Sequence, residues 1–121
     1  MRKHVAVGLV CVAVVFTSSW IAAQDVVGNP KRGEAVYVQH CASCHGVAGD
    51  GKGPVARDLV VPPANFQLPK YRAKTDFEMM IAIANGVLFS PMHAWRKKLT
   101  EEQIIDVISY IRFLAPFQDV S

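Results

Sequence analysis

Cys41-Ala42-Ser43-Cys44-His45 is the stretch of sequence on which the interpretation of the whole chain depends. It holds two of the three cysteines in the 121-residue chain, with a histidine directly behind the second. The third, Cys11, lies in an apolar run near the N-terminus. Two thiols and an imidazole clustered in a cysteine-poor chain indicate that this segment binds a chemical partner.

The N-terminal segment has the layout of a secretory signal peptide. Arg2 and Lys3 precede the apolar run Val5 to Phe16, and a small, polar stretch follows that ends at Ala23. We therefore predict that residues 1–23 are removed by cleavage after Ala23 and that Cys11 is a small hydrophobic residue in the discarded segment. An uncleaved membrane anchor is the alternative, because residues 5–23 approach the roughly 20 apolar residues that span a bilayer. Either way, residues 24–121 are expected in the periplasm.

Size and charge limit the function classes. Residues 24–121 suffice for one small domain and are too few for two. The chain has 13 basic and 10 acidic residues, but Arg2 and Lys3 belong to the predicted signal, so the exported part is close to neutral. We therefore expect no nucleic-acid partner, and membrane contact only if the N-terminal segment stays attached.

Four kinds of site are compatible with Cys41, Cys44 and His45. A disulfide and a thioredoxin-like dithiol share this cysteine spacing, but the dithiol normally lies beside a βαβ pattern, which is absent here. A zinc site needs a fourth ligand, and no second Cys-x-x-Cys supplies one. The remaining kind is covalent attachment of a c-type haem, for which Cys-x-x-Cys-His is a known signature. On a helical turn the thiols reach the two haem vinyl groups and the imidazole reaches the iron, so motif and export signal together favour haem.

Helical patterns surround the motif, and strand alternation is not evident. Asn29 and Pro30 suit the start of a helix that runs into the motif. Thr75 with Glu78, and Thr100 with Gln103, resemble the capping boxes of a middle helix that closes at Asn85-Gly86 and a last helix that ends at Pro116. Apolar residues recur along one face of each: Phe77, Met80, Ile81 and Ala84 in the middle helix, and Ile104, Val107, Ile108, Ile111 and Leu114 in the last.

The segment Gly46 to Arg72 is rich in glycine and proline and is predicted to form a long irregular loop. Loops of this length are unusual in compact domains unless they have a function of their own. We expect this one to wrap around a bound group.

In order and spacing these motifs resemble a class I monohaem cytochrome c of the small bacterial type. The resemblance covers nearly all of Lys31 to Leu114 and rests on Gly33, Tyr37, Cys41 to Gly46, Gly53-Pro54, Pro63-Ala64-Asn65-Phe66, Asn85-Gly86, a methionine-bearing loop and Tyr110-Ile111. It implies an all-α cytochrome c fold, with three or more helices and long loops wrapped around one haem c attached through Cys41 and Cys44. It also implies that the first and last helices cross, pairing Gly33 and Tyr37 with Val107 and Tyr110.

The resemblance implies His45 as one iron ligand, with the carbonyl of Pro54 orienting its other ring nitrogen. Met92 is the expected second ligand, because the family places its axial methionine six residues after the glycine, here Gly86. The family usually has proline after that methionine. This sequence has His93 there, which makes His93 the rival ligand.

The other methionines and the histidine beside the motif are not expected to ligate the iron, and Trp95 is expected to pack near the haem. Met79 and Met80 lie inside the predicted middle helix, where methionine is more often part of the core. His40 is tied too near the attachment site to reach the opposite haem face. Trp95 stands where the family places an aromatic residue close to the haem, and the alternative is an indole packed on the last helix away from it.

Ligation by histidine and methionine leaves no open position on the iron for oxygen or peroxide. The resemblance therefore implies electron transfer with redox partner proteins, as a soluble carrier or the haem subunit of a respiratory or dehydrogenase system, and no enzyme activity. A haem enzyme or gas sensor with a labile sixth ligand is the alternative, followed by a zinc or dithiol module. Basic clusters at Lys70, Arg72 and Lys74 and at 96–98 suit an acidic partner or an ordinary solvated surface.

Overall fold

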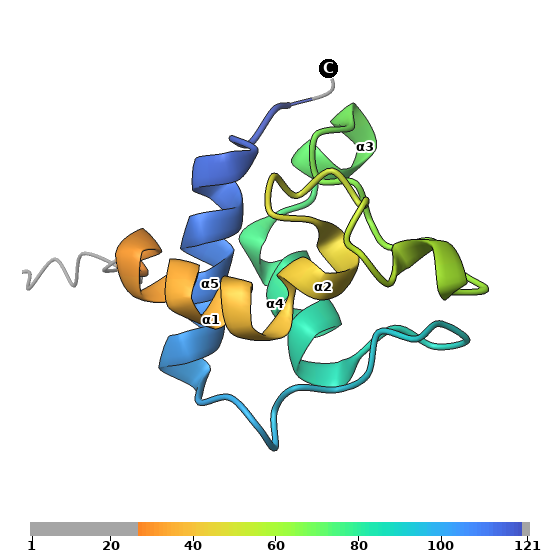
Figure 1. Cartoon of the computed structure of the whole chain (residues 1–121). Coiled ribbons are helices and arrows are strands. Elements are labelled where there is room, and N and C mark those ends of the chain that lie inside the picture. The colour runs from red at the N-terminus through yellow and green to blue at the C-terminus, as the bar shows by residue number, and fades with distance from the viewer. Residues whose placement is uncertain (1–26, 120–121) are drawn as a thin grey trace, which may run out of the picture.

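The computed structural model describes residues 27–119, and all regular elements within that range are helical (Figure 1). In chain order they are α1 (Pro30–His40), α2 (Ala42–His45), the 3₁₀ turn η1 (Ala56–Asp58), α3 (Pro69–Arg72), α4 (Asp76–Asn85) and α5 (Glu101–Leu114). The predicted all-α class is confirmed. The predicted signal peptide, residues 1–23, lies outside the described residues. Within the described range no helix has the length and apolar character needed to cross a membrane.

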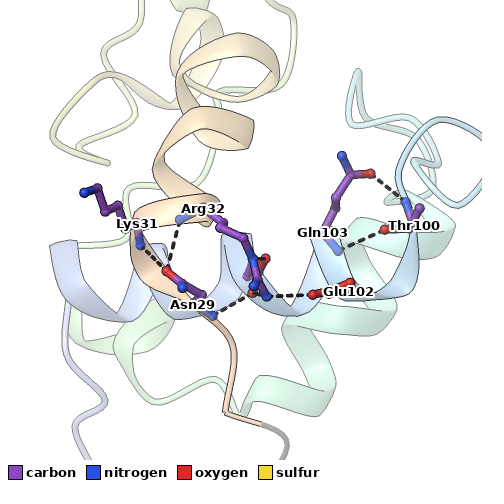
Figure 2. Close-up of polar contacts among 7 residues, drawn as sticks. Asn29, Lys31, Arg32, Thr100, Glu102 and Gln103 are labelled. Atoms are coloured by element: carbon purple, nitrogen blue, oxygen red, sulfur yellow. Dashed lines mark hydrogen bonds and ion pairs between the residues drawn. The ribbon is translucent and has the colours of Figure 1, made fainter.

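The helix starts agree with the sequence prediction. Asn29 Oδ1 accepts hydrogen bonds from the backbone N–H groups of Lys31 (3.0 Å) and Arg32 (3.2 Å), as Figure 2 shows. The backbone N–H of Gln103 donates to Thr100 Oγ1 (3.2 Å), and the side chain of Gln103 accepts from the N–H of Thr100 (2.9 Å). α4 begins with the same reciprocal box. These contacts satisfy donor groups that a helix start otherwise leaves open.

The first and last helices cross at Gly33, and this crossing organises the core. A Cβ atom on Gly33 would overlap the backbone carbonyl of Asp106 and lie 3.0 Å from the nitrogen of Val107. Only glycine permits so close an approach. Tyr37 and Val107 are fully buried beside the crossing, and the rings of Tyr37 and Tyr110 lie 5.2 Å apart. The predicted crossing of these helices is confirmed.

A buried charge ties the start of α1 to the middle of α5. Asp106 is 2% exposed, and its carboxylate accepts hydrogen bonds from the backbone N–H of Asn29 (2.6 Å) and from Nε of Arg32 (2.6 Å). Nη2 of Arg32 also donates to Glu102 (2.7 Å), completing the network in Figure 2. The hydrogen bond from Arg32 lowers the pKa of Asp106. The carboxylate therefore stays ionised in the folded protein.

The buried face of α4 differs from the prediction. The sequence pattern placed Phe77 and Ile81 on the core face, but both are exposed, whereas Met79 and Ile83 are buried. Met80 and Ala84 pack against the edge of the core. Apolar residues lie on several sides of this helix, so their spacing alone does not fix which side faces α5.

Candidate functional site

The Cys41–His45 segment forms one helical turn. The backbone N–H groups of Cys44 (3.2 Å) and His45 (2.9 Å) both donate to the carbonyl of Cys41, the residue that caps α2. The two cysteines form no disulfide and are half-buried. The buried hydroxyl of Tyr37 donates to the carbonyl of Gly46 (2.8 Å) and so anchors the residue directly behind the histidine. The motif is therefore held on a short helix packed beside α1.

The environment of Cys41 disfavours two of the alternative sites. Burial, reinforced by nearby Cys44, raises the pKa of the Cys41 thiol to about 12. Dithiol exchange uses the thiolate, which is scarce at such a pKa. Within residues 27–119, moreover, no three His, Cys, Asp or Glu side chains are grouped as metal ligands.

His45 is held by the loop that returns past α2. Its Nδ1 lies 3.0 Å from the carbonyl oxygen of Ala64, and its ring stacks on Phe66 with centroids 4.7 Å apart and planes 15° apart. Burial lowers the pKa of His45, partly opposed by the hydrogen bond to Ala64. The neutral imidazole is thereby favoured, and this is the form that binds metals.

The carbonyl partner of His45 is that of Ala64 and not that of Pro54, which the family resemblance implied. The turn that contains Pro54 is held against the backbone of α2 instead: the N–H of Gly53 donates to Cys44 O (3.1 Å) and that of Val55 to Ser43 O (3.1 Å). Pro54 is exposed. The motif Pro63-Ala64-Asn65-Phe66 thus supplies both the carbonyl and the ring that hold His45, roles that its residue types alone did not indicate.

The loop that carries Met92 is fastened to the end of α4. The N–H of Val87 donates to Met92 O (2.8 Å), and that of Trp95 donates to Ile83 O (3.0 Å). Gly86 has φ +75°, and a Cβ there would come within 2.7 Å of Met92 O. Met92 is half-buried against the core, whereas His93 is exposed. The backbone thus brings Met92 close to Gly86 and turns it inward.

Trp95 links this loop to the attachment segment. Its ring centroid lies 4.3 Å from that of His93 and 5.2 Å from that of His40, the last residue of α1. His40 immediately precedes Cys41. Trp95 is therefore near both the methionine loop and the start of the cysteine motif, and it also packs against the edge of the core.

Residues 28–111 match the family model for cytochrome c oxidase, cbb3-type, subunit III. The chain belongs to this family of c-type cytochromes. It is a cytochrome c domain of electron transport that carries covalently attached haem c. No curated protein matches this cytochrome.

Solved structures of c-type cytochromes share the fold. The match to the reducing HAO-like protein complex Kustc0457/Kustc0458 of Kuenenia stuttgartiensis has 33% identity and a TM-score of 0.65, over 70% of this chain and 42% of that one. The KustC0563 c-type cytochrome matches with 26% identity and a TM-score of 0.59, over 69% of this chain and 96% of its own. Cytochrome cL of Methylophaga aminisulfidivorans has 22% identity and a TM-score of 0.55, covering 77% of this chain and 56% of its own, and shows the fold alone. The cytochrome thus spans less than half of the chain matched in the Kuenenia complex.

Proposed function

We propose that residues 24–121 are a periplasmic electron carrier whose single haem c is attached through Cys41 and Cys44 and ligated by His45 and Met92. The observation that carries the proposal is the contact of Trp95 with both His93 and His40, which joins the inward-facing Met92 loop to the cysteine turn. Those two segments hold every residue needed to attach and ligate the haem.

The bound haem supplies a one-electron iron couple. His45 contributes a neutral imidazole, and the Ala64 carbonyl accepts its Nδ1–H, which leaves Nε2 free for the metal. The thioether of Met92 favours the ferrous state and raises the reduction potential. A haem held by both His45 and Met92 would exchange electrons and would offer no open position at which a substrate could bind the iron.

Visible spectra of the haem-loaded protein test the ligand assignment. The ferric protein should show the weak far-red band of methionine ligation, and the ferrous protein should not bind carbon monoxide. Met92→Ala should abolish the band and permit carbon monoxide binding, whereas His93→Ala should leave both unchanged.

Met79→Ala is the matched methionine control. It should keep the far-red band while costing roughly 2 to 5 kcal/mol of stability, since Met79 is a buried core residue. An unchanged band in Met92→Ala would exclude Met92 as the ligand, and loss of the band in His93→Ala would move the assignment to His93.

The size of the native assembly distinguishes a free carrier from a subunit of a larger complex. The matched chain of Kuenenia stuttgartiensis comes from a protein complex, which supports a role as the haem subunit of an oxidoreductase. Size-exclusion chromatography of the native periplasmic fraction, monitored by haem absorption, distinguishes the two. Elution at the monomer size indicates a carrier, and elution in a larger species indicates a subunit.

A further inference from the structure

Two contacts from residues 63–68 hold the imidazole of His45, one from the carbonyl of Ala64 and one from the ring of Phe66. A backbone bond ties this segment to the turn after α2: the N–H of Phe66 donates to Gly49 O (2.7 Å). A bond at one residue fixes one point and does not stop the rest of the segment from pivoting. The position of the Ala64 carbonyl over the imidazole therefore depends on a further attachment.

The side chain of Gln67 supplies that attachment. Its Nε2 donates to Ala48 O (2.8 Å) and to Leu114 O (3.1 Å), which lie 19 and 47 residues away in the sequence. A side-chain amide has two N–H donors, so both are directed at protein carbonyls although the residue is exposed. Gln67 thus bridges the start of the 46–68 loop, the end of that loop and α5.

The carbonyl of Leu114 is a suitable acceptor for this amide. Leu114 is the last residue of α5. The carbonyls of the last helical turn find no donor within their own helix, and donors from elsewhere in the fold satisfy them. The bond from Gln67 therefore completes the end of α5 while it fastens the loop.

The segments that this amide joins are packed against the core. A Cβ atom on Gly49 would lie 3.1 Å from Cδ2 of Phe66 and 3.6 Å from Cδ1 of Leu114, so the turn is enclosed between the two side chains. The N–H of Gly49 donates to Gly46 O (3.0 Å), which also accepts from the buried hydroxyl of Tyr37 (2.8 Å). Both carbonyls that receive the amide thus belong to parts of the fold that are fixed to α1 and α5.

We propose that Gln67 is a positioning residue for His45, whose side-chain amide holds residues 63–68 in place so that the Ala64 carbonyl stays on Nδ1 of the imidazole. The proposal rests on the proposed function, in which Nε2 of that imidazole ligates the iron. A carbonyl that accepts the second ring N–H of a metal-bound histidine fixes the orientation of the ring and raises its basicity. Gln67 acts on the imidazole through Ala64 and Phe66.

Gln67→Met tests the proposal, because methionine is similar in length and carries no donor. The first measurement is the NMR resonance of the His45 Nδ1–H in the reduced, haem-loaded protein with isotope-labelled histidine. This resonance should move upfield as the bond to Ala64 O weakens. The second is the reduction potential. A weaker bond to Ala64 makes the imidazole a poorer donor to ferric iron, so the equilibrium constant for reduction should rise about twofold to fivefold.

Two substitutions on the exposed side of α1 are matched controls. Gln39→Met makes the same chemical change away from the loop, and Ala35→Gly lowers stability by loss of helix propensity alone. Both should keep the wild-type resonance and potential, because a lower stability does not by itself alter the surroundings of His45 in the folded protein. Unfolding in denaturant compares the stability of all three variants.

Two results would overturn the positioning role. One is a His45 Nδ1–H resonance in Gln67→Met that coincides with that of wild type. The other is an equal displacement of the resonance in Ala35→Gly, which would show that the change follows overall stability. The ligand assignment is tested separately, by the far-red band and carbon monoxide binding of the wild-type protein and the Met92 and His93 variants. An unchanged Gln67→Met would therefore remove the positioning role and leave the proposed ligation intact.

Discussion

The carbonyl oxygen of Ala64 lies 3.0 Å from Nδ1 of His45 and joins segments 19 residues apart in the sequence. Phe66, two residues after Ala64, stacks on the same imidazole and is itself fixed by the bond from its N–H to Gly49 O (2.7 Å). The position of the histidine ring therefore depends on how the 46–68 loop folds back over α2.

Substitution of Phe66 should affect both stability and the haem. Phe66→Ala removes the ring stacked on His45 and admits water, so we expect a loss of about 1 to 2 kcal/mol for this half-buried side chain and a lower reduction potential. Denaturant unfolding and redox titration measure the two effects. Phe113→Ala, at an exposed aromatic residue, should change neither appreciably. If the potential of Phe66→Ala equals that of wild type, Phe66 does not tune the histidine.

Gly33 offers the strongest test of the helix crossing. Gly33→Ala places a methyl group on the carbonyl of Asp106, so α1 and α5 must separate, and we expect a loss of at least about 3 kcal/mol. The matched change on the exposed side of α1, Ala35→Gly, should cost only about 1 kcal/mol from helix propensity. Denaturant midpoints followed by haem absorption compare the two variants. Equal losses would show that the crossing tolerates a side chain.

The contact between Arg32 and Asp106 predicts an acid-dependent stability. Because the folded protein lowers the pKa of Asp106, its contribution is present above the ordinary value of 3.8 and is lost as the pH falls through the lower folded value. Asp106→Asn should reduce stability at neutral pH and flatten this acid dependence. Glu102→Gln, at an exposed partner of the same arginine, should have little effect. Unfolding curves at several pH values give the free energy of unfolding of both variants. If the stability of Asp106→Asn falls with acid as steeply as that of wild type, the dependence arises from other carboxylates.

The features predicted correctly from the sequence are those encoded by adjacent residues. Asn29, Thr75 and Thr100 identify the helix starts, because a cap needs only the next three or four residues. Gly33 indicates a close crossing, because a glycine at a helical position is costly unless something approaches it.

The features that were missed depend on contacts distant in sequence. Which side of α4 is buried depends on how that helix lies against α5, so the exposure of Phe77 did not follow from its spacing. The carbonyl that meets His45 depends on how a long loop closes, and any of several carbonyls in that loop satisfies the same sequence pattern. Packing selected Ala64 over Pro54.

Trp95 should support the proposed bond between Met92 and the iron. The indole contacts His93 on the methionine loop and His40 beside the cysteine turn, and the backbone N–H of Trp95 donates to Ile83 O (3.0 Å). Trp95→Ala keeps that backbone bond but removes the ring, so the loop should open more readily and added imidazole should displace Met92 at lower concentration. Trp95→Phe keeps an aromatic ring and should resemble wild type.

Imidazole titrations monitored at the far-red band measure this displacement. Met79→Ala controls for a general loss of core packing, because Met79 is a buried residue of α4, outside the loop. Imidazole should bind Trp95→Ala more tightly than either Met79→Ala or wild type. If Met79→Ala and Trp95→Ala bind imidazole equally well, the effect reflects overall stability and Trp95 has no specific role in holding the loop. If Trp95→Ala binds no better than wild type, the ring contributes nothing to the methionine bond, and its contacts with His40 and His93 serve packing alone.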